Sequence, residues 1–140
     1  MDATRIIVCL LLLPCLQACG GRVTTVNGED MWITSLAFQQ YAEEVFRHQN
    51  QVGQELLDAQ EANESGAPGW GQSLSKAEDR LWDACLLLND LAIAYQERRE
   101  LDLWHQRQAA YSVSACEAAT IEAERLLDRG ARLSDVGSGE

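Results

Sequence analysis

The stretch over residues 76–129 constrains the fold more than any other part of the chain, because it contains no glycine and no proline. Apolar residues recur at alternating spacings of three and four from Leu74 into the first part of this stretch, which is the pattern of one buried face of an α-helix. A single helix over the whole stretch would be about 80 Å long, at roughly 1.5 Å per residue. Two cysteines within it decide between one long helix and a helical hairpin. The apolar stripe comprises Leu74, Ala77, Leu81, Ala84, Leu88, Leu91 and Tyr95.

The first residues of the chain have the pattern of a secretory signal peptide. Arg5 precedes an apolar run over residues 6–13, and small residues follow before Cys19. A leader of this kind is removed on export, so it does not belong to the fold. The apolar run is also too short to cross a membrane, since a transmembrane helix needs roughly 20 apolar residues.

The end of this leader, Leu16-Gln17-Ala18-Cys19, resembles the bacterial lipobox, in which the cysteine is acylated and becomes the first residue of the mature protein. The resemblance implies that residues 1–18 are cleaved and that the cysteine carries acyl chains such as palmitate, which anchor it to a membrane. It also implies the outer membrane, with the polypeptide facing the periplasm, because no aspartate follows the cysteine. An ordinary secretory signal, cut without lipid attachment, is the alternative.

The mature chain would have about 120 residues, which is enough for one domain with a modest core. Its net charge is −11, the same as that of the whole sequence, because Asp2 and Arg5 leave together with the leader. A strongly acidic domain repels phosphate groups. The charge therefore argues against nucleic acid as a partner and against anionic lipid headgroups as a ligand of the polypeptide.

Small and β-branched residues follow Cys19, and we expect residues 19–29 to form a spacer with a turn at Asn27-Gly28. The first helix is predicted to begin after this spacer and to run over residues 30–63. Apolar residues recur in it every seven positions, as they do along one face of a helix. The repeating residues are Phe38, Val45, Val52 and Ala59.

A loop over residues 65–71 is predicted to separate the first helix from the second, because its three glycines and one proline cannot sustain a helix. Ser73 or Ser75 would cap the second helix. Trp70 lies in the loop, where the flanking glycines would let its indole face outward. Tryptophan is enriched at binding hot spots, so Trp70 is the predicted partner-binding residue. Burial of its ring as a lid over the helix ends is the alternative.

The other three tryptophans lie at or beside predicted helices. Trp32 and Trp104 fall near helix ends, and aromatic residues at the ends of a bundle commonly plug its core. Trp82 falls beside the apolar stripe of the second helix. We therefore expect Trp32 and Trp104 to be core residues.

Cys85 and Cys116 are the two cysteines left once Cys9 and Cys15 leave with the leader and Cys19 accepts lipid. An even pair in an exported protein favours a disulfide, and two buried free thiols are the alternative. In one continuous helix their Cα atoms would stand about 46 Å apart, whereas a disulfide needs roughly 4.4–6.8 Å. The chain must therefore fold back between them.

A hairpin that is symmetric about this pair turns near Glu100 and Leu101, and Asp102 is suited to cap the third helix. That helix is predicted to run to Arg129, with Gly130 as its C-terminal cap. A frayed tail is expected over residues 134–140. We therefore predict an all-α, three-helix bundle over residues 30–133, in which a disulfide links two antiparallel helices. The register sets Leu88 opposite Val113, Ala92 opposite Ala109, Leu81 opposite Thr120 and Leu74 opposite Leu127.

The sequence contains no recognisable catalytic or metal-binding motif. Its two histidines, His48 and His105, lie outside any Glu-x-x-His motif, which di-metal helical bundles use. Neither a glycine-rich nucleophile elbow nor a Cys-x-x-Cys pair is present. We therefore expect no enzyme activity, no cofactor and no metal.

These features predict a lipid-anchored envelope protein that binds another envelope protein as an assembly accessory module. Its plan, with a lipidated N-terminus, a small helical body and one disulfide, resembles that of the secretin-chaperone lipoproteins called pilotins. The resemblance is one of plan only. The alternative is a small enzyme or ligand-binding protein that uses a cavity of the bundle.

Overall fold

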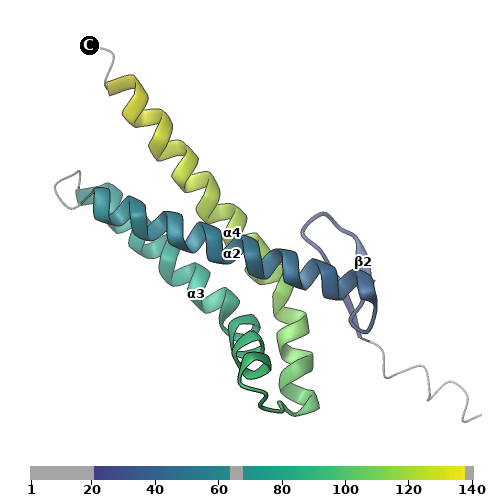
Figure 1. Cartoon of the computed structure of the whole chain (residues 1–140). Helices are drawn as coiled ribbons and strands as arrows, with labels where there is room; N and C mark the ends of the chain where they lie inside the picture. The colour runs from purple at the N-terminus through teal and green to yellow at the C-terminus, as the bar shows by residue number, and fades with distance from the viewer. Residues whose placement is uncertain (1–20, 64–67, 138–140) are drawn as a thin grey trace, which may run out of the picture.

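The computed structural model describes residues 21–63 and 68–137, which form a β-hairpin followed by three helices (Figure 1). The predicted all-α bundle is confirmed, with two short strands added to it. The predicted leader and Cys19 lie outside the described residues. The elements are β1 (Arg22–Thr24), β2 (Asp30–Trp32), α2 (Leu36–Ala62), α3 (Pro68–Gln96) and α4 (Leu103–Gly137).

Buried apolar side chains from all three helices form one core. In α2, Phe38, Val45 and Val52 are buried at the predicted spacing of seven, and Leu56 joins them. Helix α4 contacts both other helices, so the core lies where the three meet. The buried members from α3 and α4 include Leu74, Leu81, Cys85, Leu88, Val113, Cys116 and Ala123.

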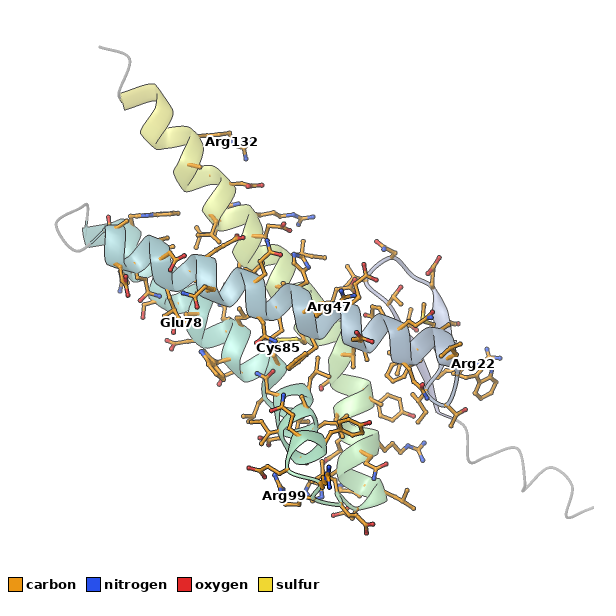
Figure 2. The ribbon with its side chains drawn as sticks, viewed as in Figure 1. Arg22, Arg47, Glu78, Cys85, Arg99 and Arg132 are labelled. Carbon is orange, nitrogen blue, oxygen red and sulfur yellow. A yellow bond between two sulfur atoms is a disulfide. The ribbon has the colours of Figure 1, made fainter. Side chains whose placement is uncertain are left out.

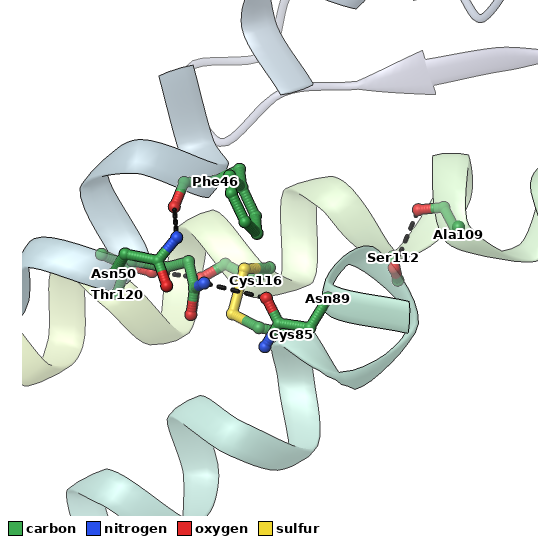
Figure 3. Close-up of a disulfide and its surroundings, with 9 residues drawn as sticks. Phe46, Asn50, Cys85, Asn89, Ala109, Ser112, Cys116 and Thr120 are labelled. Atoms are coloured by element: carbon green, nitrogen blue, oxygen red, sulfur yellow. Dashed lines mark hydrogen bonds between the residues drawn. A yellow bond between two sulfur atoms is a disulfide. The ribbon is translucent and has the colours of Figure 1, made fainter. Parts of the chain in front are cut away.

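The predicted disulfide joins Cys85 of α3 to Cys116 of α4, with their Cα atoms 4.6 Å apart (Figure 3). Both cysteines are fully buried, and Phe46 of α2 lies beside the bond. Thr120 is buried next to it and donates its hydroxyl hydrogen bond to the Cys116 carbonyl oxygen at 2.8 Å. Cross-linking a loop of this length stabilises the fold by roughly 3–4 kcal/mol in the chain-entropy model. The folded-back pair of helices is therefore confirmed.

The turn between α3 and α4 contains the predicted midpoint at Glu100 and Leu101. Asp102 caps α4 as predicted, because its side chain accepts hydrogen bonds from the backbone N–H groups of Trp104 at 2.9 Å and His105 at 3.0 Å. The bond from the His105 backbone, followed by that from its side chain, lowers the pKa of the Asp102 carboxyl below its usual value.

Helix α3 ends in a Schellman motif built on an arginine. Arg98 has a φ of 54°, in the left-handed region that favours glycine. The Arg99 N–H donates to the Ala94 carbonyl oxygen at 2.8 Å, and the Arg98 N–H donates to that of Tyr95 at 3.2 Å. The left-handed backbone of a non-glycine residue costs about 1–2 kcal/mol. The two backbone hydrogen bonds therefore hold Arg98 in a conformation that a non-glycine residue disfavours.

The spacer predicted over residues 19–29 is wrong for residues 22–24, because these form β1 and pair with β2 in antiparallel register. The turn predicted at Asn27-Gly28 is confirmed, with Gly28 at a φ of 84°. Val23 and Thr25 are buried, and β1 packs against α4. The first helix consequently begins at Leu36 rather than at residue 30, and the Ser35 hydroxyl caps it by accepting a bond from the Phe38 N–H at 3.1 Å. Each strand has only three residues, too few for an alternating pattern to be recognised in the sequence.

The predicted start of the second helix is also wrong, because α3 begins at Pro68. Proline suits the first helical position, where a backbone N–H has no partner within the helix. Residues 69–71 therefore lie in the first turn of α3 and not in a loop. The Ser73 hydroxyl caps nothing, since it donates to the Gly69 carbonyl oxygen one turn earlier at 2.9 Å.

The third helix runs past its predicted end, because α4 continues through Gly130 to Gly137. Gly130 is therefore not a helix cap, and residues 134–137 of the predicted tail are helical. The Cα atom of Gly130 lies so close to Trp70 that a Cβ at residue 130 would overlap the indole ring. The glycine is needed for the close approach of two helices, not for a left-handed backbone.

Candidate functional site

Trp70, the predicted partner-binding residue, is half-buried in the first turn of α3. Its ring packs against the core and covers Gly130 of α4. The expectation of an outward-facing indole in a glycine-rich loop is therefore wrong. The structure places Trp70 in the alternative position, as a lid over the helix ends.

The other three tryptophans are all exposed. Trp32 lies under the Arg22 guanidinium, whose central carbon is 4.5 Å from the ring centroid. Trp104 lies beside the α3–α4 turn, which projects away from α2 in Figure 1. The prediction that Trp32 and Trp104 plug the core is thus wrong, because neither side chain is covered by another part of the described chain.

Helix α3 carries a second apolar stripe on its outer face, formed by Trp82, Leu86 and Ile93. We name these three residues the outer stripe. Their spacings of four and seven place them on one side of the helix. They are 59%, 53% and 47% exposed, respectively, and they lie on a flank of α3, roughly 100° around the helix axis from the buried Leu81 and Cys85. Helix α3 is therefore apolar on two faces, and only one of them has a partner within the described chain.

Helix α2 extends this apolar surface through the exposed Leu57. Leu57 and Trp82 line a shallow groove of about 190 Å³ between α2 and α3. Gln49 and Asn89 also line this groove, and the Gln49 side-chain amide donates a hydrogen bond to the Asn89 side-chain oxygen at 2.9 Å. Gly53 lies in its floor, where a Cβ would meet only Leu81, at 3.8 Å. The surface thus offers a recess next to a row of large side chains.

An acidic row borders the outer stripe. Each stripe residue has an aspartate three positions before it, and residues at this spacing are neighbours on a helix surface. All three aspartates are exposed, and none forms a salt bridge to another described residue. The row consists of Asp79, Asp83 and Asp90. The exposed part of α3 therefore carries an apolar row with an acidic row beside it.

A polar network lines a pocket between the β-hairpin, α2 and α4. Tyr41 donates its hydroxyl hydrogen bond to Glu117 at 2.6 Å, and the Val26 N–H donates to the same carboxylate at 3.2 Å. Burial, followed by the hydrogen bond to Glu117, raises the pKa of Tyr41 above its usual value. His48 lies nearby, with its Nε2 atom 3.6 Å from Glu124. The Glu117 carboxylate ties the hairpin to the helices, which is a structural role.

Among the described residues, no group of three histidine, cysteine, aspartate or glutamate side chains is arranged to hold a metal ion. In the same part of the chain, every helix is too short or too polar to span a bilayer. Comparison with protein-family models, with curated proteins and with solved structures found no match.

The signal for the outer stripe is present in the sequence, although the sequence prediction placed the partner-binding residue at Trp70 instead. The spacing of Trp82, Leu86 and Ile93 is visible in the chain, as is the aspartate before each of them. A helix whose core stripe is already complete and that carries further large apolar residues at helical spacing is a candidate for docking.

Proposed function

We propose that this protein is a lipid-anchored component of the bacterial outer membrane that binds a helical segment of another envelope protein. The anchor is Cys19, and the docking surface is the outer stripe of α3. The observation that carries the docking surface is the row of three exposed large apolar side chains, each bordered by an aspartate. A row of apolar residues at helical spacing matches the way in which an amphipathic helix is bound in a groove.

The partner helix is expected to carry lysine or arginine along one edge. The acidic row of Asp79, Asp83 and Asp90 lies alongside the apolar centre, so basic residues of the partner would meet it at the rim of the interface. Rim charges of opposite sign mainly accelerate association and select the partner, while burial of the apolar centre supplies the affinity. A net charge of −11 attracts a basic partner at long range. The same charge disfavours a second copy of this chain.

Two designed peptides test this docking surface. Both carry leucines at positions i, i+4 and i+7 of a helix, and they differ only in having lysine or glutamate along the edge. We expect the lysine-edged peptide to bind the mature chain at least tenfold more tightly, as measured by fluorescence anisotropy of labelled peptide. Equal affinities for the two peptides would contradict the assigned charge complementarity.

Trp82→Ala should weaken binding of the lysine-edged peptide at least tenfold, which corresponds to about 1.4 kcal/mol. The substitution should change the free energy of unfolding by only about 0.5 kcal/mol, because the side chain is exposed in the free protein. Trp32→Ala is the matched control, since it removes another exposed tryptophan from a different surface. Unchanged peptide affinity in Trp82→Ala would show that the outer stripe does not form the docking surface.

The lipid anchor is tested separately in cells. Cys19→Ser should abolish incorporation of a fatty-acid probe and release the protein from the membrane fraction, because Cys19 is the only proposed acceptor. Cys9→Ser and Cys15→Ser are the controls, since both residues belong to the predicted leader and should leave labelling of the mature protein unchanged. Labelling that persists in Cys19→Ser would refute the anchor.

A further inference from the structure

The tip of the α3–α4 hairpin carries large apolar side chains at unusually high exposure. Tyr95 and Leu103 are 87% and 82% exposed, and Trp104 is 66% exposed. We name these three residues the hairpin tip. They flank the turn on both sides, and no other described element covers them (Figure 1). These three side chains, near one projecting turn, form an apolar patch without a partner among the described residues.

The start of the described chain lies on the same side of the molecule as the hairpin tip. Gly21 packs against Tyr111 of α4 so closely that a Cβ at Gly21 would overlap the Tyr111 hydroxyl. Tyr111 stands seven residues after Trp104, which is two helical turns or about 10 Å, and the two side chains share one face of α4. Figure 2 shows Arg22 of β1 and Arg99 of the α3–α4 turn at two separate corners of the molecule, both away from Arg132 of α4.

Little chain separates the proposed lipid anchor from the described residues. Cys19 precedes Gly21 by two residues, which span at most about 7 Å. This reach is comparable to the distance of about 10 Å along α4 between Tyr111 and Trp104. A bilayer that holds the acyl chains of Cys19 is consequently within reach of the hairpin tip.

The hairpin tip also differs from the rest of the molecule in charge. Residues 95–107 contain three arginines and three acidic residues, whereas the chain as a whole has a net charge of −11. Arg99 pairs with Glu97 at 3.3 Å, and Arg107 lies over the Tyr111 ring at 5.6 Å. The residues around the hairpin tip therefore add no net charge of their own to the repulsion between the acidic domain and a lipid surface.

We propose that the hairpin tip inserts into the interfacial region of the bilayer that holds the lipid anchor, as a second membrane contact. This inference rests on the lipid anchor of the proposed function. Tryptophan and tyrosine are enriched at membrane interfaces, and leucine enters the acyl region. Arginines around the tip can extend toward lipid phosphates while their stems stay in apolar surroundings. Because the anchor keeps the tip near the surface, its high effective concentration makes even a weak insertion effective. The second contact would orient the domain relative to the membrane.

The test measures quenching of tryptophan fluorescence by brominated acyl chains. The acylated mature protein is reconstituted into vesicles of phosphatidylethanolamine and phosphatidylglycerol that contain a brominated phosphatidylcholine. We expect partial quenching in the wild-type protein, most of which is lost in Trp104→Phe and retained in the matched control Trp82→Phe. Quenching that is absent, or that Trp104→Phe leaves unchanged, would overturn the proposal. Raising the phosphatidylglycerol content should have little effect, since the tip is locally neutral.

A second tether separates failure of the tip from failure of the anchor. The mature chain with an N-terminal polyhistidine tag in place of the lipid is bound to vesicles that contain nickel-chelating and brominated lipids. Quenching that depends on Trp104 in this arrangement supports the insertion even if Cys19 proves not to be acylated. Tethered protein without such quenching refutes the insertion even if Cys19 proves to be acylated.

Discussion

The two ends of the α3–α4 pair differ in how far their tryptophans are buried. At one end Trp70 is half-buried, and its ring lies over Gly130 of the neighbouring helix. At the other end Trp104 stands exposed next to a turn that projects away from α2 (Figure 1). The difference shows that a tryptophan at a helix end is buried only where an opposing helix offers a surface for it. A glycine supplies this surface for Trp70, and no described element supplies one for Trp104.

The Cys85–Cys116 disulfide lies between the two ends and covalently joins α3 to α4. Replacing both cysteines, in Cys85→Ala/Cys116→Ala, should destabilise the fold by about 3–4 kcal/mol, because the unfolded chain is no longer constrained. Urea unfolding followed by fluorescence would measure the loss. A decrease below about 1 kcal/mol would indicate that the ends are held together without the cross-link.

Truncation of the two tryptophans tests the comparison directly. Trp70→Ala should destabilise the protein by about 2–3 kcal/mol, somewhat less than the loss of a fully buried tryptophan. Trp104→Ala should change stability by about 0.5 kcal/mol or less, because its side chain is exposed. Urea unfolding of both variants gives the two values. Similar losses at both positions would contradict the contrast between the ends.

Gly130→Ala tests the contact between Gly130 and the Trp70 ring. In the wild-type background the added methyl group meets the indole, and overpacking should destabilise the protein by about 1–3 kcal/mol. In the Trp70→Ala background the clash is gone, so the better helix propensity of alanine should stabilise it by about 1 kcal/mol. The reversal of sign in a double-mutant cycle is the expected outcome. Independent effects of the two substitutions would refute the contact.

Arg98→Gly probes the other end, where the turn holds an arginine in a left-handed backbone. Glycine adopts this conformation without strain but loses more entropy on folding, so we expect a net gain of about 0.5–1 kcal/mol. A small rise in melting temperature by differential scanning calorimetry would show it. A fall would mean that the Arg98 side chain contributes more to the turn than its backbone strain removes.

The helices and the disulfide could be predicted because their signals are local or follow from simple geometry. The seven-residue repeat in α2 and the absence of glycine and proline over residues 76–129 indicate helices directly. The distance between Cys85 and Cys116 in a straight helix then requires a hairpin. Neither step depends on knowing how the helices pack against one another.

Most of the features that sequence reasoning missed depend on such packing. Gly130 looks like a helix cap until Trp70 is seen against it, and Pro68 looks like part of a loop until it is found at the start of α3. The β-hairpin has three-residue strands, and its buried Val23 belongs to a core assembled mostly from distant residues. The outer stripe could have been found, because its spacing and its aspartates are visible in the sequence.

The most direct test of the central claim is site-specific photo-crosslinking in living cells. A photoreactive amino acid replaces Leu86 in the outer stripe, Trp104 in the hairpin tip, or Trp32 as an exposed control. The account predicts a discrete protein adduct from position 86 that maps by mass spectrometry to a basic amphipathic helix, with no such adduct from positions 32 and 104. An adduct of equal yield from position 32, or none from position 86, would contradict the claim that the protein docks its partner through the outer face of α3.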